Sequence, residues 1–166
     1  MHIHRGHLPG CIGRITELHA AYYAQAAGFG LDFEAKVAGE LAAFCLRLNP
    51  QSDGLWLAVQ DGVVHGSLVI DGSGGTPESA HLRWFILSDA ARGQGIGTRL
   101  LGEALAFCRA SGHARVHLWT FEGLHAARHL YEKHGFRLVH SQRGTQWGRE
   151  VAEQRFECRL LSPGPA

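Results

Sequence analysis

Residues 88–101 combine a glycine-rich turn with a cation, a pattern suited to holding a phosphate group. Three glycines stand at alternate positions after a basic residue: Arg92, then Gly93, Gly95 and Gly97. Glycine lets backbone amides approach a ligand closely, and the unpaired amides at the start of a helix favour an anion. A strand-like run ends just before this segment and an amphipathic pattern follows it. The segment therefore predicts an anion-binding turn between a strand and a helix.

Two common nucleotide-binding turns fit this spacing poorly. A P-loop ends in Gly-Lys-Ser/Thr, whereas Thr98 follows Gly97 here with no lysine between them. A dinucleotide fingerprint has a third glycine where this chain has Leu100. It also has an acid about 20 residues further on, where residues 113–117 read His-Ala-Arg-Val-His. Both interpretations are therefore disfavoured.

Tyr131 lies in a second segment whose residues could do chemistry. Its phenol is protonated at neutral pH and can donate a hydrogen bond to negative charge that grows during a reaction. The surrounding residues 126–136 read Ala-Ala-Arg-His-Leu-Tyr-Glu-Lys-His-Gly-Phe. This run is typical of a helix that ends at a glycine.

Together the two segments resemble the GCN5-related N-acetyltransferases (GNAT). The pattern Arg92-x-x-Gly95-x-Gly97 after a strand is similar to that family's pyrophosphate-binding signature. Residues 126–136 are similar to its A-x-x-x-L-Y-x-x-x-G-F segment, and the two motifs come in the family's order. The resemblance covers the chain from about residue 54 to residue 160.

The resemblance implies transfer of an acetyl group from acetyl-CoA directly to a primary amine, with no acyl-enzyme. Acetyl-CoA would lie where the strands 81–87 and 115–121 splay apart, and Tyr131 would be the general acid near the coenzyme sulfur. The three glycines would leave room for the pyrophosphate, because a Cβ there would crowd it. The residues expected to bind the coenzyme are Ile86, Leu87, Arg92, Gly93, Gln94, Gly95, Ile96, Gly97, Thr98 and Leu124.

Leu124 departs from the family's common usage. Many members have an asparagine at the equivalent position, where it bonds the pantetheine arm. We expect that contact to be lost, with weaker coenzyme binding, or to be replaced by Glu122 or His125. The family's frequent strand-end proline is also absent, since Ser88-Asp89 leads into the turn.

The base that deprotonates the amine has three candidates in the sequence. They are Glu34 at the start of the second helix, His81 on the strand beside the wedge, and Glu122 just past the other strand. Each also has a purely structural interpretation, such as a carboxylate that stabilises a helix start. A chain of water molecules could serve instead, so the alternatives stay open.

Aromatic side chains concentrate where the acceptor would bind. We expect the acceptor pocket to be formed by Tyr23, Phe29, Phe33 and Trp84, which also pack the core in part. A closed pocket would favour a small-molecule amine, and an open groove would favour a protein lysine or N-terminus. A non-catalytic CoA-binding module is a further alternative.

The opening helices add a narrower resemblance. The pattern Leu18-His19-x-x-Tyr22-Tyr23 and residues 28–38 are similar to the acetyltransferase halves that are fused to MarR-type regulators. No winged-helix segment precedes them in this sequence, so we do not expect DNA binding.

The elements that must position these residues follow from the periodicity of the sequence. Helices are predicted over 11–28, 32–48, 96–112 and 124–134, and strands over 55–59, 63–70, 81–87, 115–121, 136–139 and 153–160, the last at the sheet edge. The order is that of an α+β protein with the GNAT fold: a mixed, mostly antiparallel sheet of six to seven strands flanked by helices. We expect one domain over 1–162 and a flexible tail over 163–166.

The bulk composition limits the possible partners. The chain has 166 residues, 45% of them hydrophobic, with 16 Lys plus Arg against 15 Asp plus Glu. This balance predicts no nucleic-acid or membrane partner. Four scattered cysteines form no CxxC pair, and the helical pair His125 and His129 lacks a third ligand, so we expect no metal. No signal or membrane-span pattern is present, which favours a cytoplasmic protein; a homodimer is possible, since family members are often dimers.

Overall fold

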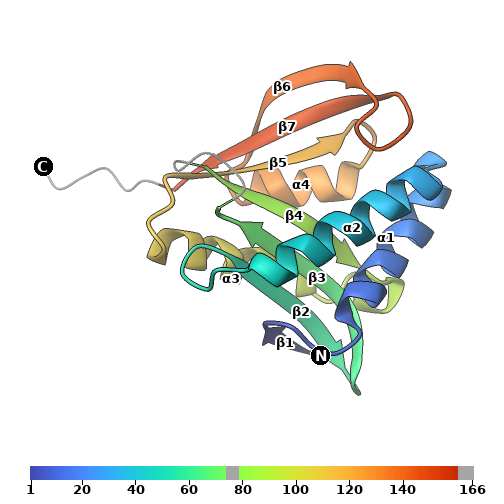
Figure 1. Cartoon of the computed structure of the whole chain (residues 1–166). Helices are drawn as coiled ribbons and strands as arrows, with labels where there is room; N and C mark the ends of the chain where they lie inside the picture. Colours follow the sequence, from blue (N-terminus) through green and yellow to red (C-terminus); the bar gives the residue numbers. More distant parts are fainter. Residues whose placement is uncertain (74–78, 161–166) are drawn as a thin grey trace, which may run out of the picture.

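The computed structural model describes residues 1–73 and 79–160, so the predicted tail and most of the loop before the strand 81–87 lie outside the described residues. Figure 1 shows a central sheet with helices on both sides. In chain order the elements are β1 (His2–Arg5), α1 (Cys11–Ala27), α2 (Leu31–Arg47), β2 (Gly54–Gln60), β3 (Val63–Asp71), β4 (Ser79–Leu87), the 3₁₀ turn η1 (Asp89–Ala91), α3 (Ile96–Ala110), β5 (Arg115–Phe121), α4 (His125–Lys133), β6 (Arg137–Gly144) and β7 (Val151–Arg159).

The sheet has seven strands in the order β1-β2-β3-β4-β5-β7-β6. Neighbouring strands are antiparallel except for β4 and β5, which are parallel. This mixed sheet confirms the predicted fold class. One expectation about it was wrong: β7 is not the edge strand but lies between β5 and β6. It pairs with both, because the hairpin of β6 and β7 folds back so that its second strand meets β5.

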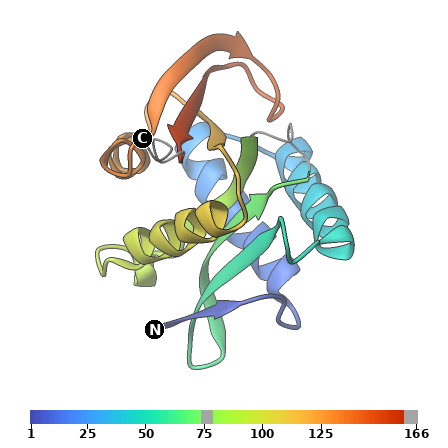
Figure 2. The ribbon, with the colours of Figure 1, turned by 90° about the vertical axis from the view of Figure 1, so that its left-hand side faces the viewer.

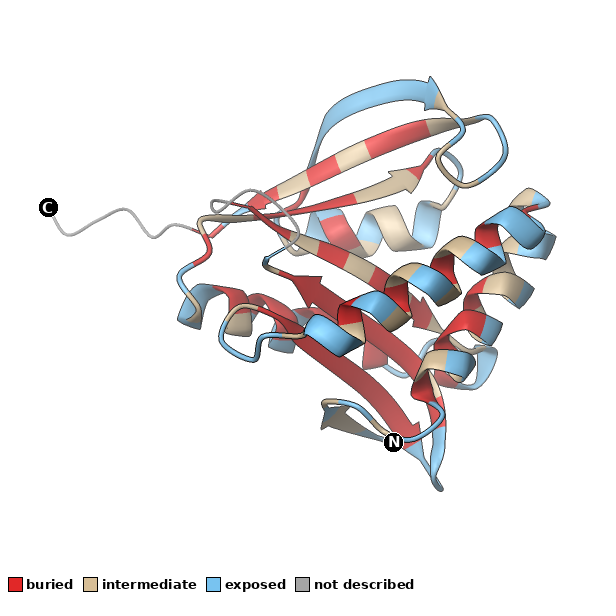
Figure 3. Ribbon diagram, viewed as in Figure 1, coloured by how far each residue is buried: buried red, intermediate tan, exposed pale blue. Residues whose placement is uncertain are grey.

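Two hydrophobic cores lie on opposite faces of the sheet. α1 and α2 cover one face, and α3 and α4 lie on the other (Figures 1 and 2). Side chains of β2 alternate between the cores, with Leu55 and Leu57 toward α1 and α2, and Trp56 and Ala58 toward α3. Burial on both faces explains why β2 is apolar at successive positions (Figure 3).

Sequence periodicity did not predict β1. His2–Arg5 is mostly polar, and the strand forms because it pairs antiparallel with the edge of β2. The Arg5 guanidinium carbon lies 5.3 Å from the centre of the Trp56 ring and 4.5 Å from that of Phe107. Contacts made by tertiary structure, rather than a local pattern, therefore hold this strand.

β6 is longer than the predicted strand 136–139. Every residue of Arg137–Gly144 except the last is exposed, as Figure 3 shows. An edge strand with both faces open to solvent needs no apolar alternation, and its cationic side chains discourage pairing with other chains. The sequence of β6 therefore lacks the alternation of apolar and polar residues from which a strand is predicted.

The parallel strands β4 and β5 separate soon after they begin. They pair only over Ser79–His81 and Arg115–His117. A β-bulge in β4 accompanies the separation: Val69 of β3 pairs with Arg83, but Ser67 pairs with Ile86. Two residues of β4, Trp84 and Phe85, thus have no paired residue in β3 or β5.

Trp84 adopts a backbone conformation that is rare for a bulky side chain. Its φ is +45°, in the left-handed region. The hydroxyl of Ser67 donates a hydrogen bond of 2.7 Å to the Trp84 carbonyl, and Ser67 is fully buried. The hydrogen bond from Ser67 therefore stabilises the bulge, and the bulge directs the end of β4 away from β5.

Candidate active site

The glycine turn connects the end of β4 to α3 and is open to solvent. Gly93 and Gly95 have φ values of +73° and +74°. A Cβ built on either glycine would meet no atom within 4 Å. These glycines are therefore needed for the left-handed backbone, and the space beside them is free for a ligand.

The start of α3 supplies unpaired amide donors to this space. Its first helical hydrogen bond runs from the Arg99 amide to the Gly95 carbonyl, at 3.1 Å. The amides of residues 96–98 consequently have no partner inside the helix, and no side chain caps it. Thr98 is exposed, whereas the side chain of Ile96 is buried in the core and leaves only its amide for a ligand. This cradle fits the pyrophosphate of a coenzyme.

Gly97 has a packing role that the sequence did not predict. It is buried, and a Cβ there would lie 3.2 Å from Cδ2 of Leu130 and 3.3 Å from Cδ1 of Leu87. A Cβ at this position would therefore meet packed side chains. Gly97 allows α3 to pack closely against β4 and α4, and its place beside the phosphates stays a prediction.

Arg92 stands at the entrance to a cavity of about 320 Å³ between the end of β4 and α4. Its guanidinium carbon lies 4.6 Å from the centre of the Tyr22 ring, and its Nη1 lies 2.9 Å from a carboxylate oxygen of Asp89. Of the expected coenzyme residues, those that line this coenzyme-side cavity are Ile86, Leu87, Arg92 and Leu124. Leu124 gives an apolar wall where an asparagine would give an amide, and the neighbouring His125 also lines the cavity.

A second cavity, of about 240 Å³, lies on the side of α1 and α2. All four residues expected to form the acceptor pocket line it: Tyr23, Phe29, Phe33 and Trp84. Phe121 and Trp147 also line this cavity and were not predicted from the sequence. The centre of the Phe29 ring lies 5.4 Å from that of Phe121 and 6.3 Å from that of Trp147. No local pattern could have placed them here, because they come from β5 and from the loop between β6 and β7.

The two cavities meet where β4 and β5 diverge. Four residues line both of them: Tyr23, Phe85, Thr120 and Tyr131. Tyr131 is 7% exposed and packs among Phe85, Phe136 and Phe156. Burial raises the pKa of Tyr131 well above its usual value, so the phenol stays protonated at neutral pH.

The three candidate bases are separated by the fold. Glu34 is exposed and lies in a shallow depression on the outer side of α1 and α2, away from both cavities. A helix advances about 100° per residue, so Glu34 points away when the adjacent Phe33 faces inward. Glu122 is exposed and lines neither cavity. His81 does line the acceptor cavity.

His81 is held against His117 at the point where the parallel pairing ends. Their ring centres lie 4.6 Å apart at an interplanar angle of 18°, and His117 Nδ1 is 2.6 Å from the Ser79 hydroxyl. Burial, together with the nearby His117 and Arg83, lowers the pKa of His81 to about 3. The imidazole is therefore neutral at physiological pH and a weak base.

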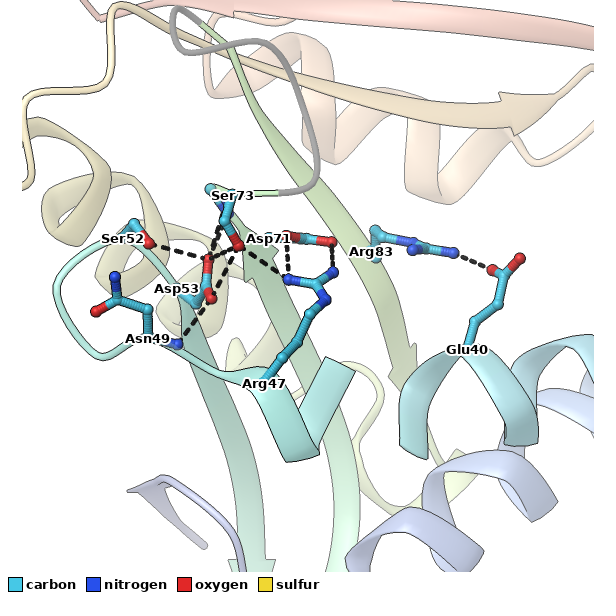
Figure 4. Close-up of polar contacts among 9 residues, drawn as sticks. Glu40, Arg47, Asn49, Ser52, Asp53, Asp71, Ser73 and Arg83 are labelled. Atoms are coloured by element: carbon cyan, nitrogen blue, oxygen red, sulfur yellow. Dashed lines mark hydrogen bonds and ion pairs between the residues drawn. The ribbon is translucent and has the colours of Figure 1, made fainter. Parts of the chain in front are cut away.

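A charged cluster of Lys36, Glu40 and Arg83 also lines the acceptor cavity, and it was not predicted from the sequence. Glu40 of α2 accepts a hydrogen bond from Arg83 of β4, as Figure 4 shows, and lies 3.4 Å from Nζ of Lys36. All three side chains line the cavity. Glu40 falls three residues after Val37, beside the apolar stripe of α2, and its side chain is 40% exposed. A carboxylate next to an apolar helix face was the signal that could have found it.

A separate polar network fixes the far end of α2. Arg47 donates two hydrogen bonds to the carboxylate of the buried Asp71 at the end of β3, and Asp53 bonds the amides of Asn49 and Gly72 (Figure 4). This network attaches α2 to the sheet, and so it orients the helix face that carries Lys36 and Glu40.

The splayed parallel strands and the glycine cradle at the start of α3 are typical of a transferase that binds a phosphate-bearing coenzyme. The chain belongs to the acetyltransferase (GNAT) family, whose model matches residues 14–136. By this membership it is an acetyltransferase.

Solved structures share this fold. The ribosomal-protein-alanine N-acetyltransferase of Brucella melitensis has a TM-score of 0.76 at 17% identity, over 96% of this chain and 100% of that one. A GNAT-family acetyltransferase of Staphylococcus aureus Mu50 has a TM-score of 0.73 at 14% identity, over 96% and 100%. A GNAT-family acetyltransferase of Elizabethkingia anophelis with acetyl-CoA bound has a TM-score of 0.56 at 20% identity, over 73% and 82%.

Two further findings concern the described residues 1–73 and 79–160. No helix among them is long and apolar enough to cross a membrane. They also contain no group of three or more His, Cys, Asp or Glu side chains that could hold a metal ion.

Proposed function

We propose that this protein acetylates the primary amine of a small molecule. The observation that carries the proposal is the meeting of the two cavities at Tyr23, Phe85, Thr120 and Tyr131. An amine that enters from the acceptor cavity reaches a thioester that enters from the coenzyme-side cavity at this point. Direct transfer then needs only the correct positioning of both groups.

The coenzyme-side residues have separate roles in this proposal. Arg92 and the amides of residues 93–98 hold the pyrophosphate, while Ile86, Leu87 and Leu124 contact the apolar part of the arm. Bound acetyl-CoA supplies the thioester carbonyl that the amine attacks. Because Trp84 and Phe85 have no paired residue in β3 or β5, their amides are candidate backbone donors to the thioester carbonyl oxygen.

Tyr131 acts as the general acid. The amine nitrogen forms a bond to the carbonyl carbon, the carbon–sulfur bond breaks, and the sulfur takes a proton from the Tyr131 hydroxyl. Solvent then returns a proton to the tyrosine, and the amide nitrogen releases its proton to water. The raised pKa of Tyr131 keeps the donor protonated until sulfur gains negative charge.

His81 orients the acceptor rather than acting as a strong base. It is the one member of the three predicted candidates that lines the acceptor cavity, but its pKa of about 3 makes it a weak proton acceptor. A neutral imidazole can still accept a hydrogen bond from the amine. Water carries the proton away, as one of the sequence alternatives allows. Glu34 and Glu122 have no part in this mechanism.

The walls of the acceptor cavity favour a small molecule over a protein. They come from seven places in the fold: α1, the connection between α1 and α2, α2, β4, β5, α4 and the loop between β6 and β7. A volume of about 240 Å³ is small even for a drug-sized ligand. Acetylation of a protein N-terminus is the second candidate, because a structure of similar fold is a ribosomal-protein-alanine N-acetyltransferase.

The test measures thiol release from acetyl-CoA in the presence of a library of small amines and of short peptides with free N-termini or lysines. We expect turnover with small amines and little with peptides. Turnover with peptides alone would favour the second candidate, and binding of acetyl-CoA without turnover on any amine would favour a non-catalytic module. The resemblance to MarR-fused acetyltransferases and the homodimer remain hypotheses beside this proposal.

A further inference from the structure

The acceptor cavity has an aromatic part and a charged part, and the charged part indicates what the acceptor carries. The aromatic part is a set of rings with centres 5 to 6 Å apart along the cluster: Tyr23, Phe29, Phe33, Phe121 and Trp147. The charged part consists of Lys36, Glu40 and Arg83. Two cations and one carboxylate leave one net positive charge on this part of the wall.

Arg83 has hydrogen-bond donors that no described residue accepts. Among the described residues, the Glu40 carboxylate is the one acceptor of a hydrogen bond from its guanidinium, which carries five N–H groups. The guanidinium carbon lies 4.1 Å from the centre of the Trp84 ring, so the planar group is held in place. Its side chain is 23% exposed, and it faces the cavity. A fixed guanidinium with spare donors is suited to a carboxylate.

The charges around the cavity disfavour an acceptor that carries a second positive charge besides its reacting amine. Burial lowers the pKa of His81 most, and His117, Arg83 and Arg155 lower it further, so the imidazole is neutral and the charged cations at this wall are Arg83 and Lys36. Asp71 acts in the opposite direction, but it is already paired with Arg47. His19, at the other side of the cavity, is also neutral at physiological pH because burial lowers its pKa to about 4.

The geometry points to an acceptor that is a small amino acid or a similar amine with a carboxylate and an apolar side chain. Its carboxylate binds Arg83 and Lys36, its side chain lies on the aromatic rings, and its amine faces Tyr131. This inference rests on the proposed function. Arg83 precedes Phe85, where the cavities meet, by two residues, which span at most about 7 Å of chain. A short molecule can therefore span the two positions.

The experiment compares matched acceptors with the same aromatic side chain. Thiol release from acetyl-CoA is measured with phenylalanine, with phenylalanine amide, with phenethylamine and with spermidine. We expect kcat/KM for phenylalanine to exceed that for the two uncharged-end analogues about 10- to 100-fold, the effect of one charge-assisted bond. Spermidine, which brings further cations, should be the poorest acceptor.

Variants assign the effect to the charged wall. Arg83→Gln and Lys36→Gln should each lower kcat/KM for phenylalanine about 10-fold or more while that for phenethylamine changes little. Because Arg83 also packs on Trp84, Arg83→Lys serves as a second variant that keeps the charge but loses the fork. Arg143→Gln is the matched control, since Arg143 is an exposed residue of β6 outside both cavities.

The outcomes separate this inference from the proposed function. Equal or better turnover of phenethylamine or spermidine would overturn the inference and leave the function standing. An unchanged preference for phenylalanine in both Arg83→Gln and Lys36→Gln would also overturn it. Failure of every small amine to release thiol, with acetyl-CoA still bound, would overturn the proposed function itself.

Discussion

Tyr131 is one of the four residues that line both cavities. Substitution by phenylalanine removes its hydroxyl and keeps its ring. Tyr131→Phe should lower kcat about 100-fold, because it removes the hydroxyl that we propose protonates the leaving sulfur. The KM for acetyl-CoA should change little, since the ring still packs among Phe85, Phe136 and Phe156. Steady-state kinetics with thermal unfolding as a control for folding measures both effects. An unchanged kcat would contradict the role of general acid.

Gly95 tests whether the turn binds the pyrophosphate through its backbone. Gly95→Ala should reduce the free energy of unfolding by about 1 kcal/mol, because alanine at a φ of +74° is strained although no atom lies within 4 Å of its Cβ. It should also weaken acetyl-CoA binding several-fold, measured by calorimetry. Gly62→Ala is the matched control, with a φ of +76° and equally open space in the β2–β3 turn. Equal coenzyme affinity in both variants would argue against the cradle.

The residues that could be predicted from sequence are those whose roles depend on local spacing. Arg92, Tyr131 and the open glycines sit in short motifs, and the aromatic residues of α1 and α2 lie close together in the chain. The packing of Gly97 was not predicted, because its neighbours Leu87 and Leu130 come from other elements. Arg83 was overlooked because its partner Glu40 comes from another element.

At the scale of elements, the loop between β6 and β7 forms part of the acceptor cavity. Trp147 lines the cavity and lies 5.6 Å, centre to centre, from Phe121, and Arg149 Nη1 donates to the Gly28 carbonyl at 3.3 Å. The loop therefore reaches across to the connection between α1 and α2. Its side chains limit the length of the acceptor.

Trp147→Ala should enlarge the cavity and change which amines are accepted. We expect KM to rise about 10-fold for the best small amine, because aromatic surface is lost. The kcat/KM of bulkier amines should rise relative to that of the best small amine. Competition kinetics with acceptors of increasing size gives the measurement. Leu138→Ala, at an exposed position of β6, is the control that should leave the preference unchanged. A uniform loss for all acceptors would show that the tryptophan does not set their size.

Elements with strong apolar periodicity were predicted close to their observed bounds, as for α2 and β5. β1 and most of β6 were not predicted, because both are edge strands held by pairing with a neighbour rather than by an apolar face. The position of β7 depends on how a hairpin meets β5, and that information is absent from its own residues. The bulge in β4 likewise depends on the Ser67 contact from β3.

At the scale of the whole molecule, three histidines that are kept neutral make folding sensitive to acid. Burial lowers the pKa of His19 and His117 to about 4 and that of His81 to about 3, from 6.5. The unfolded chain therefore binds more protons than the folded one below pH 6.5. The stability that depends on these groups is full above that pH and is lost as the pH falls toward their folded pKa values.

The free energy of unfolding should fall by up to about 1.4 kcal/mol per pH unit for each of these histidines between pH 6 and 4. Urea denaturation at several pH values measures the slope. His19→Gln should reduce it by the contribution of one histidine, whereas His140→Gln, on the exposed edge strand, should not. A flat profile over this range would contradict the assignment.

The separation of β4 and β5 also leaves the sheet with two inner edges. β5 remains paired with β7 as far as Phe121, and β4 pairs with β3 on its other side, so backbone groups that face the wedge from either strand have no ladder partner there. These amides should exchange with deuterated solvent faster than those of β2, and they should slow when coenzyme occupies the wedge. The coenzyme would then act on the protein as a removable strand, and the protection of a few interior amides would report its presence before any acetyl group is transferred.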